Sequence, residues 1–196
     1  MKKKGLVCLL LTCLFVTGCS KNPGLKAEEL TADTLYISKD GSIVSGIVES
    51  FDKEYYVKEE LESFIEEEIE DYNSQSEKDR IKLSSLAIEE KGQARMVIKY
   101  ASIEDYAEAN KTQASLITFD EAYAQGLLPD TMKNMADGSS TSLEAIKADP
   151  KNKVAIITEE YDVILDGTVL YYQNCAAKST ESVHTSGTEA SIIIFK

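Results

Sequence analysis

The residue types that most often carry nucleophilic and metal chemistry are scarce in this sequence. His184 is the single histidine, and it lies in a polar Ser-Val-His-Thr-Ser stretch. A serine or cysteine nucleophile with a histidine base would have to recruit His184 or Cys175, and no Gly-x-Ser-x-Gly elbow is present. Structural zinc needs several closely spaced Cys or His ligands. We therefore expect no catalytic residue of this kind, no metal site and no cofactor, and we expect Cys175 to be a small, partly buried apolar group.

Carboxylates are the abundant reactive group, with 34 Asp and Glu against 21 Lys and Arg. Two carboxylates a few ångströms apart can hydrolyse glycosides, but so many acids give no means of choosing a pair. The densest group is Glu62, Glu66 and Glu70, which recur four residues apart and therefore share one face of a helix. This face is interpreted either as a docking face for a cationic partner or a loose Ca²⁺ sink, or as a solvated surface that aids solubility.

The N-terminus has the pattern of an export signal. Three lysines precede an apolar run of about a dozen residues, which is too short to span a bilayer. The Val-Thr-Gly-Cys motif at positions 16–19 then resembles the lipobox of bacterial lipoproteins. The resemblance implies that residues 1–18 are a signal peptide, that cleavage falls between Gly18 and Cys19, and that Cys19 carries a lipid. It also implies a location on the extracytoplasmic face of the cell membrane, with the N-terminal lipid as the anchor.

The strongly acidic balance excludes several classes of partner. At a net charge of −13, the chain is repelled by phosphate backbones, so we expect no nucleic acid partner. An anionic membrane surface repels the domain as well, and membrane attachment is therefore expected to depend on the lipid. Residues 19–30 read as a polar tether, and residues 31–196 are long enough for a single domain with its own core.

Glycine turns flanked by β-branched residues predict three hairpins. They are centred on Asp40-Gly41, Lys91-Gly92 and Asp166-Gly167, and they cover residues 34–48, 81–100 and 163–172. In the second hairpin the apolar phase slips in the first arm, which predicts a bulge at Ser84-Ser85. Residues 154–158 and 191–195 are predicted to be further strands. The second is expected to lie inside a sheet, because it is a continuous apolar run. Residues 173–189 read as polar and turn-rich.

Helices are predicted between these strands. The longest is expected over residues 52–73 with Asp52 as its cap, and its apolar arc also includes Glu68, whose side chain we expect to reach out to solvent. Ser102 is expected to cap a second helix and Asp120 a third. Residues 127–150 are predicted to leave the core as a long excursion, with a short helix opened by a capping box from Thr141 to Glu144.

These elements predict an α+β fold, with a mostly antiparallel sheet built from hairpins and helices packed on one side. The mature part resembles the many small surface lipoproteins of Gram-positive bacteria, a general likeness that lends no functional residues. We expect a non-enzymatic module that binds an envelope protein or a cationic or small-molecule ligand, with Glu62, Glu66 and Glu70 as its partner-binding residues. The alternative is a small surface hydrolase that acts through paired carboxylates on a cell-wall or glycan substrate.

Overall fold

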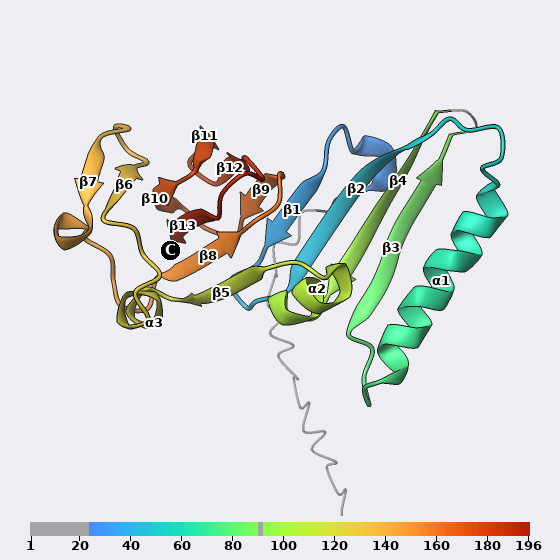
Figure 1. Ribbon diagram of the computed structural model, residues 1–196, viewed down its shortest axis with the longest axis horizontal. Helices are drawn as coiled ribbons and strands as arrows, with labels where there is room; N and C mark the ends of the chain where they lie inside the picture. Colours follow the sequence, from blue (N-terminus) through green and yellow to red (C-terminus); the bar gives the residue numbers. More distant parts are fainter. Residues whose placement is uncertain (1–23, 90–91) are drawn as a thin grey trace, which may run out of the picture.

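The computed structural model describes residues 24–89 and 92–196, and within them the chain forms an α+β fold (Figure 1). The first of two sheets has seven strands in the order β11-β12-β9-β1-β2-β4-β3, and the second has six in the order β5-β8-β13-β10-β6-β7. The lipobox, with Gly18 and Cys19, lies outside the described residues. None of the helices in the described part is long and apolar enough to cross a membrane.

The bounds of the elements are as follows. The first sheet contains β1 (Thr34–Ile37), β2 (Ile43–Phe51), β3 (Ile81–Ile88), β4 (Gly92–Tyr100), β9 (Asp162–Leu165), β11 (Cys175–Ser179) and β12 (Ser182–Thr185). The second contains β5 (Ala114–Thr118), β6 (Thr131–Asn134), β7 (Ser140–Ser142), β8 (Lys153–Ile157), β10 (Val169–Gln173) and β13 (Ser191–Phe195). The helices are α1 (Lys58–Ser74), α2 (Ile103–Asn110) and α3 (Phe119–Ala124), with 3₁₀ turns η1 (Ala27–Glu29) and η2 (Leu143–Ala145).

The first two predicted hairpins are confirmed. β1 and β2 are antiparallel around a turn in which Gly41 has a φ of 94° and the Asp40 carboxylate accepts a hydrogen bond from the Ser42 amide at 2.9 Å. β3 and β4 are also antiparallel, and their register shifts between Leu83 and Ser85, as the bulge prediction requires. The bulge has a structural use, because the Ser85 hydroxyl accepts a hydrogen bond from the Ala27 amide of η1 at 3.1 Å.

The third predicted hairpin is wrong, because its two arms belong to different sheets. β9 lies parallel to β1 and antiparallel to β12, whereas β10 pairs with β13 and β6. The turn between them is hydrogen-bonded to both sheets. The Asp166 amide donates to the Ile37 carbonyl at 2.9 Å, and the Thr168 amide donates to the Lys196 carbonyl at 2.9 Å. Asp166-Gly167 is therefore the point where the chain crosses from one sheet to the other.

Residues 173–189 are also more regular than predicted, since they contain the β11–β12 hairpin. β11 is the outer strand of the first sheet, and residues 176–179 on it are exposed. An edge strand with solvated side chains lacks the alternation of apolar and polar residues that marks a strand. The sequence of this segment therefore resembles that of a loop.

Helix α1 begins at Lys58, not at the predicted Asp52, and the residue before it, Val57, gives no side-chain cap. Residues 52–57 form a turn instead, with the Tyr56 amide bonded to the Lys53 carbonyl at 3.1 Å. Farther along α1, Ile65 is buried and Ile69 packs against the core beside β3. Glu68 is exposed, as predicted.

The caps of the shorter helices agree with prediction at one of three places. The Ser102 hydroxyl accepts a hydrogen bond from the Asp105 amide at 3.1 Å and caps α2 as expected. α3 is capped by Thr118 in a capping box with Glu121, not by Asp120, because the helix starts immediately after β5. The Thr141 capping box is absent as well: η2 is a single 3₁₀ turn after β7 without a side-chain cap.

The main core joins the two sheets. It contains Ile37 and Ile43 from the first sheet together with Ile157, Ile193 and Phe195 from the second, all fully buried. As predicted, the last strand is internal, since β13 lies between β8 and β10. At the other side of this core, the buried Asp105 of α2 forms an ion pair with Arg80, which holds α2 to the start of β3.

Candidate functional site

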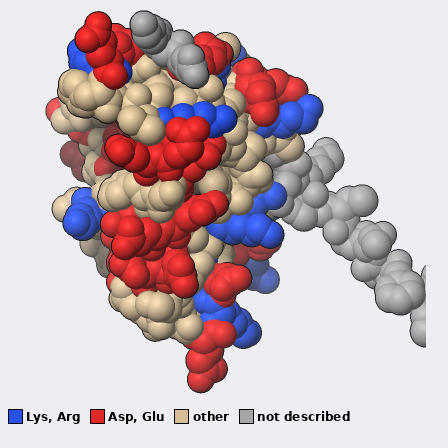
Figure 2. Space-filling model, turned by 90° about the vertical axis from the view of Figure 1, so that its right-hand side faces the viewer, with Lys and Arg blue, Asp and Glu red and all other residues tan. Residues whose placement is uncertain are grey.

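The predicted acidic face lies along α1, where Figure 2 shows carboxylates running down the surface of the molecule. Its three predicted residues have different surroundings. Glu62 pairs with Lys58 of the same helix at 3.6 Å, whereas Glu66 and Glu70 line a shallow hollow between α1 and β3. Within the described residues no group of three or more His, Cys, Asp or Glu is placed to hold a metal ion.

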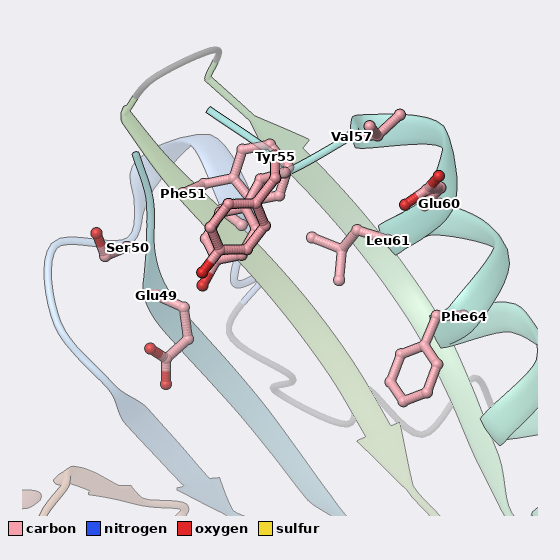
Figure 3. A pocket seen from close by; sticks show the side chains of 10 residues that line it. Glu49, Ser50, Phe51, Tyr55, Val57, Glu60, Leu61 and Phe64 are labelled. Atoms are coloured by element: carbon pink, nitrogen blue, oxygen red, sulfur yellow. The ribbon is translucent and has the colours of Figure 1, made fainter. Parts of the chain in front are cut away.

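A more distinctive surface lies at the N-terminal end of α1, where a groove separates the helix from β2 and β4 (Figure 3). We call this the aromatic groove. It has a volume of about 530 Å³, and its apolar lining consists of Phe51, Tyr55, Tyr56, Val57, Leu61, Phe64 and Ala94. Phe51 is the last residue of β2, and the three residues that follow lead into the turn before α1. The late start of α1 therefore places Tyr55 and Tyr56 in a connection and not on the helix.

Three aromatic rings of the groove pack on one another, and all of its rings except that of Phe51 are exposed. Phe51 stacks on Tyr56 with their ring centroids 5.1 Å apart, and Tyr55 meets Tyr56 edge-on at 5.0 Å. Yet Tyr55 is 73% exposed and Phe64 is 58% exposed. Contiguous apolar side chains of this size lose favourable burial when they face water, and such patches in soluble proteins are typical of binding surfaces.

Carboxylates flank the aromatic groove. Glu49 lies on the β2 side and Glu60 on the α1 side, and Glu54 and Glu59 are exposed nearby in the chain. The lysines of this region already have partners, because Lys53 pairs with Asp52 and Lys58 with Glu62. The groove therefore combines apolar rings with net negative charge.

Aromatic rings separate the two carboxylates of the groove. Figure 3 places Glu49 and Glu60 on opposite sides of the groove, with aromatic rings in the space between them. Glycoside hydrolysis needs two carboxyl groups that both reach one bond of the substrate, and here aromatic rings lie in the space between the two side chains. This arrangement supports binding of a ligand along the rings better than acid–base chemistry on it.

His184 and Cys175 lie in another hollow, on the β11–β12 hairpin. The His184 Nδ1 atom is 2.9 Å from Asp162 Oδ1, and the Lys178 ammonium donates to Asp162 Oδ2 at 2.7 Å. Burial disfavours the ionised form of Asp162, but the hydrogen bonds from Lys178 and His184 outweigh it and hold the pKa of Asp162 below its ordinary value. Asp162, Lys178 and His184 thus join β9, β11 and β12 at the edge of the sheet.

Cys175 is half-buried, in agreement with the sequence prediction. Burial raises the pKa of its thiol to about 12. Because the thiolate is the nucleophilic form, the raised pKa of Cys175 disfavours a nucleophilic role near neutral pH. The pair of Cys175 and His184 therefore does not form an activated nucleophile.

Comparison with known proteins gives no match to a family model, to a curated protein or to a solved structure. The functional conclusion depends on the chain's own surfaces.

Sequence reasoning missed the aromatic groove, although one signal was present. The Phe-Asp-Lys-Glu-Tyr-Tyr-Val stretch at positions 51–57 places four large apolar residues around a few charged ones, between a strand and a helix. Once residues 52–57 are assigned to the helix, these side chains are distributed around its circumference and no patch is visible.

Proposed function

We propose that this protein is a non-enzymatic binding module, held at the extracytoplasmic face of the membrane by a lipid on Cys19, and that the aromatic groove binds a protein segment carrying both basic and apolar side chains. The observation that carries the proposal is the set of exposed rings between β2 and α1, with carboxylates at both sides.

The chemistry of the groove favours this kind of partner. Tyrosine presents a broad apolar face with a hydroxyl at its tip and is enriched among the residues that dominate binding energies. An aromatic face also attracts a lysine or arginine cation when the cation lies over the ring. Glu49 and Glu60 add charge complementarity, which favours basic segments and disfavours acidic ones.

A panel of synthetic peptides tests the proposal. We expect the full chain to bind a peptide that alternates lysine with leucine, and to bind neither a glutamate–leucine nor a lysine–serine peptide of the same length. The double variant Tyr55→Ala, Phe64→Ala is expected to lose about tenfold or more in affinity, because truncation of a central ring costs more than ~1.4 kcal/mol. Affinities are measured by isothermal titration calorimetry at two salt concentrations.

Tyr123→Ala is the matched control, since Tyr123 is 57% exposed but lies on α3, away from the groove. It is expected to bind like the unmodified chain. The proposal is wrong if the double variant binds as tightly as this control, or if the lysine–serine peptide binds as well as the lysine–leucine peptide.

The anchor has its own test. Cys19→Ala removes the sulfur that would carry the lipid, and we expect this variant to lose labelling by a fatty-acid analogue in cells. Lipid attachment, not surface charge, is expected to hold the acidic domain at the membrane. The variant Cys175→Ala retains Cys19 and should be labelled normally. Equal labelling of the Cys19→Ala variant would overturn the lipoprotein assignment and leave the groove proposal untouched.

A further inference from the structure

We propose that a second site, separate from the aromatic groove, binds a phosphate-bearing anion. We call it the lysine pocket, and it is lined by Lys39, Asp149, Lys151, Asn152, Lys153 and Lys196. Its volume is about 530 Å³. Four lysines thus line one depression of a chain whose net charge is −13.

The four lysines come from three separate parts of the chain and are held on fixed backbone. Lys39 lies in the tight turn between β1 and β2. Lys151 lies in a turn in which its amide donates a hydrogen bond to the Asp149 carboxylate at 2.8 Å. Lys153 is the first residue of β8. Lys196 follows β13 and exchanges two backbone hydrogen bonds with Thr168, at 2.9 and 3.0 Å.

Gly167 allows Lys39 and Lys196 to come together. A Cβ atom at position 167 would collide with the Lys196 carbonyl oxygen and would approach Cε of Lys39 to 3.0 Å. The crossing between the two sheets, at Asp166-Gly167, therefore brings the turn after β1 and the residue after β13 to the same place.

Several basic side chains elsewhere in the described residues are paired with carboxylates, but these four are not. Lys26, Lys178, Arg80 and Arg95 each form an ion pair at 3.2 Å or less with a carboxylate. Within the described residues, none of the four lysines of the pocket forms an ion pair. An anion that enters the pocket can be attracted by all four lysines without competition from an existing ion pair.

The acids nearby do not remove this charge. Asp149 has the one acidic side chain in the lining, and one of its oxygens already accepts a hydrogen bond from the Lys151 amide. The pKa of Glu121 lies below its ordinary value mainly because Thr118 donates hydrogen bonds to its carboxylate. The electrostatic attraction of Lys153 contributes less to this shift. The Asn152 side chain, half-buried in the lining, adds a neutral donor for an oxygen of the anion.

A lysine ammonium group binds phosphate as a mobile point charge, whereas arginine binds a planar carboxylate through two hydrogen bonds. A pocket of four lysines therefore fits a phosphate ester better than a carboxylate. The phosphate can come from a lipid headgroup or from a soluble phosphate ester. The chain as a whole is repelled by an anionic surface, and the lysine pocket is the local exception to that repulsion.

The test compares the full chain with two variants of equal net charge. The pocket variant carries Lys39→Gln, Lys151→Gln, Lys153→Gln and Lys196→Gln. The control variant carries Lys78→Gln, Lys99→Gln, Lys111→Gln and Lys133→Gln, which are exposed lysines on other elements. Binding of a soluble ligand is measured by calorimetry as titration with glycerol phosphate, and titration with chloride at equal ionic strength is the comparison. Lipid binding is measured by sedimentation as the gain in affinity from neutral phosphatidylcholine vesicles to vesicles containing phosphatidylglycerol.

We expect the unmodified chain and the control variant to bind at least one of these probes, and the pocket variant to lose the binding. For vesicles the loss is expected to be on the order of 100-fold, since each lysine near an anionic surface contributes substantially to attraction. Binding of glycerol phosphate identifies a soluble ligand, and a gain on anionic vesicles alone identifies a headgroup. The proposal is overturned if neither probe binds, or if the control variant loses as much as the pocket variant. Because the peptide test uses other residues, either proposal can fail alone.

Discussion

Phe195→Ala is expected to lower the free energy of unfolding by about 3–5 kcal/mol. Phe195 is fully buried in the core that joins the two sheets, one residue from the last position of the sequence. Its backbone lies between Lys153 of β8 and Val169 of β10. Removal of the ring therefore leaves a cavity between two sheets that hydrogen bonds hold in place, and the surroundings can collapse only in part.

Chemical denaturation monitored by circular dichroism measures this loss. Ile192→Ala in the same strand is the control, because Ile192 is only half-buried and points toward the smaller cluster on the other face of the sheet. We expect its cost to be smaller by roughly 1–3 kcal/mol. Equal costs for the two substitutions would contradict the position of β13 at the centre of the fold.

The protein is expected to lose stability steeply in alkaline solution. Burial raises the pKa of Cys175 to about 12, and burial with a hydrogen bond to Glu108 raises the pKa of Tyr72 to about 12. Burial also raises the pKa of Tyr106, which is fully buried. In the unfolded chain a thiol loses its proton near pH 8.5 and a tyrosine near pH 10.

The sign follows from proton binding. Above these unfolded values the folded state binds more protons than the unfolded state, so stability falls as pH rises, by up to about 1.4 kcal/mol per pH unit for each group. The contribution of these groups is complete below about pH 8.5 and is lost progressively toward pH 12. Tyr72 contributes less than the others because its ring is half-exposed and partly screened.

Melting temperatures between pH 7 and pH 11 check the prediction. We expect these groups to change the melting temperature little up to pH 8.5 and to lower it above that pH. In Cys175→Ala the first part of this decrease should be smaller. Tyr123→Phe, at an exposed position, is expected to leave the alkaline fall unchanged. A melting temperature that stays level to pH 11 would show that these protons are not linked to folding.

Local signals predicted the local parts of the fold. Asp40-Gly41 specified its hairpin, the slip in apolar phase located the bulge at Ser85, and Ser102 marked the start of α2. Each of these depends on residues within about ten positions of one another. The apolar run of β13 also predicted correctly that the strand is internal, because a continuous run needs cover on both faces.

The failures concern choices that local sequence does not decide. Asp166-Gly167 has the composition of a hairpin turn, but Val163 pairs with Leu35 and Tyr172 with Ile193, and these partners belong to two different sheets. Asp52 is a good capping residue, yet the stacking of Tyr56 on Phe51 holds the next residues in a turn. One sheet was therefore expected where two exist, and α1 was expected to begin too early.

The candidate sites were less predictable than the fold. Glu62, Glu66 and Glu70 were recognised from their spacing, and the same four-residue spacing places Lys58 beside Glu62. The lysine pocket was invisible because Lys39 and Lys196 lie at opposite ends of the described chain. The aromatic groove left a trace in the Tyr55-Tyr56 pair, which the predicted helix obscured.

The parallel pairing of β1 with β9 constrains the order in which the protein can fold. The hairpin of β1 with β2 can close at once because its turn is short. Its other edge, from Thr34 to Ile37, must wait until residues 162–165 have been synthesised. During that interval the buried strand presents free amides and carbonyls to any neighbouring chain. Until this distant pairing forms, the first sheet is incomplete and its open edge can pair with another chain.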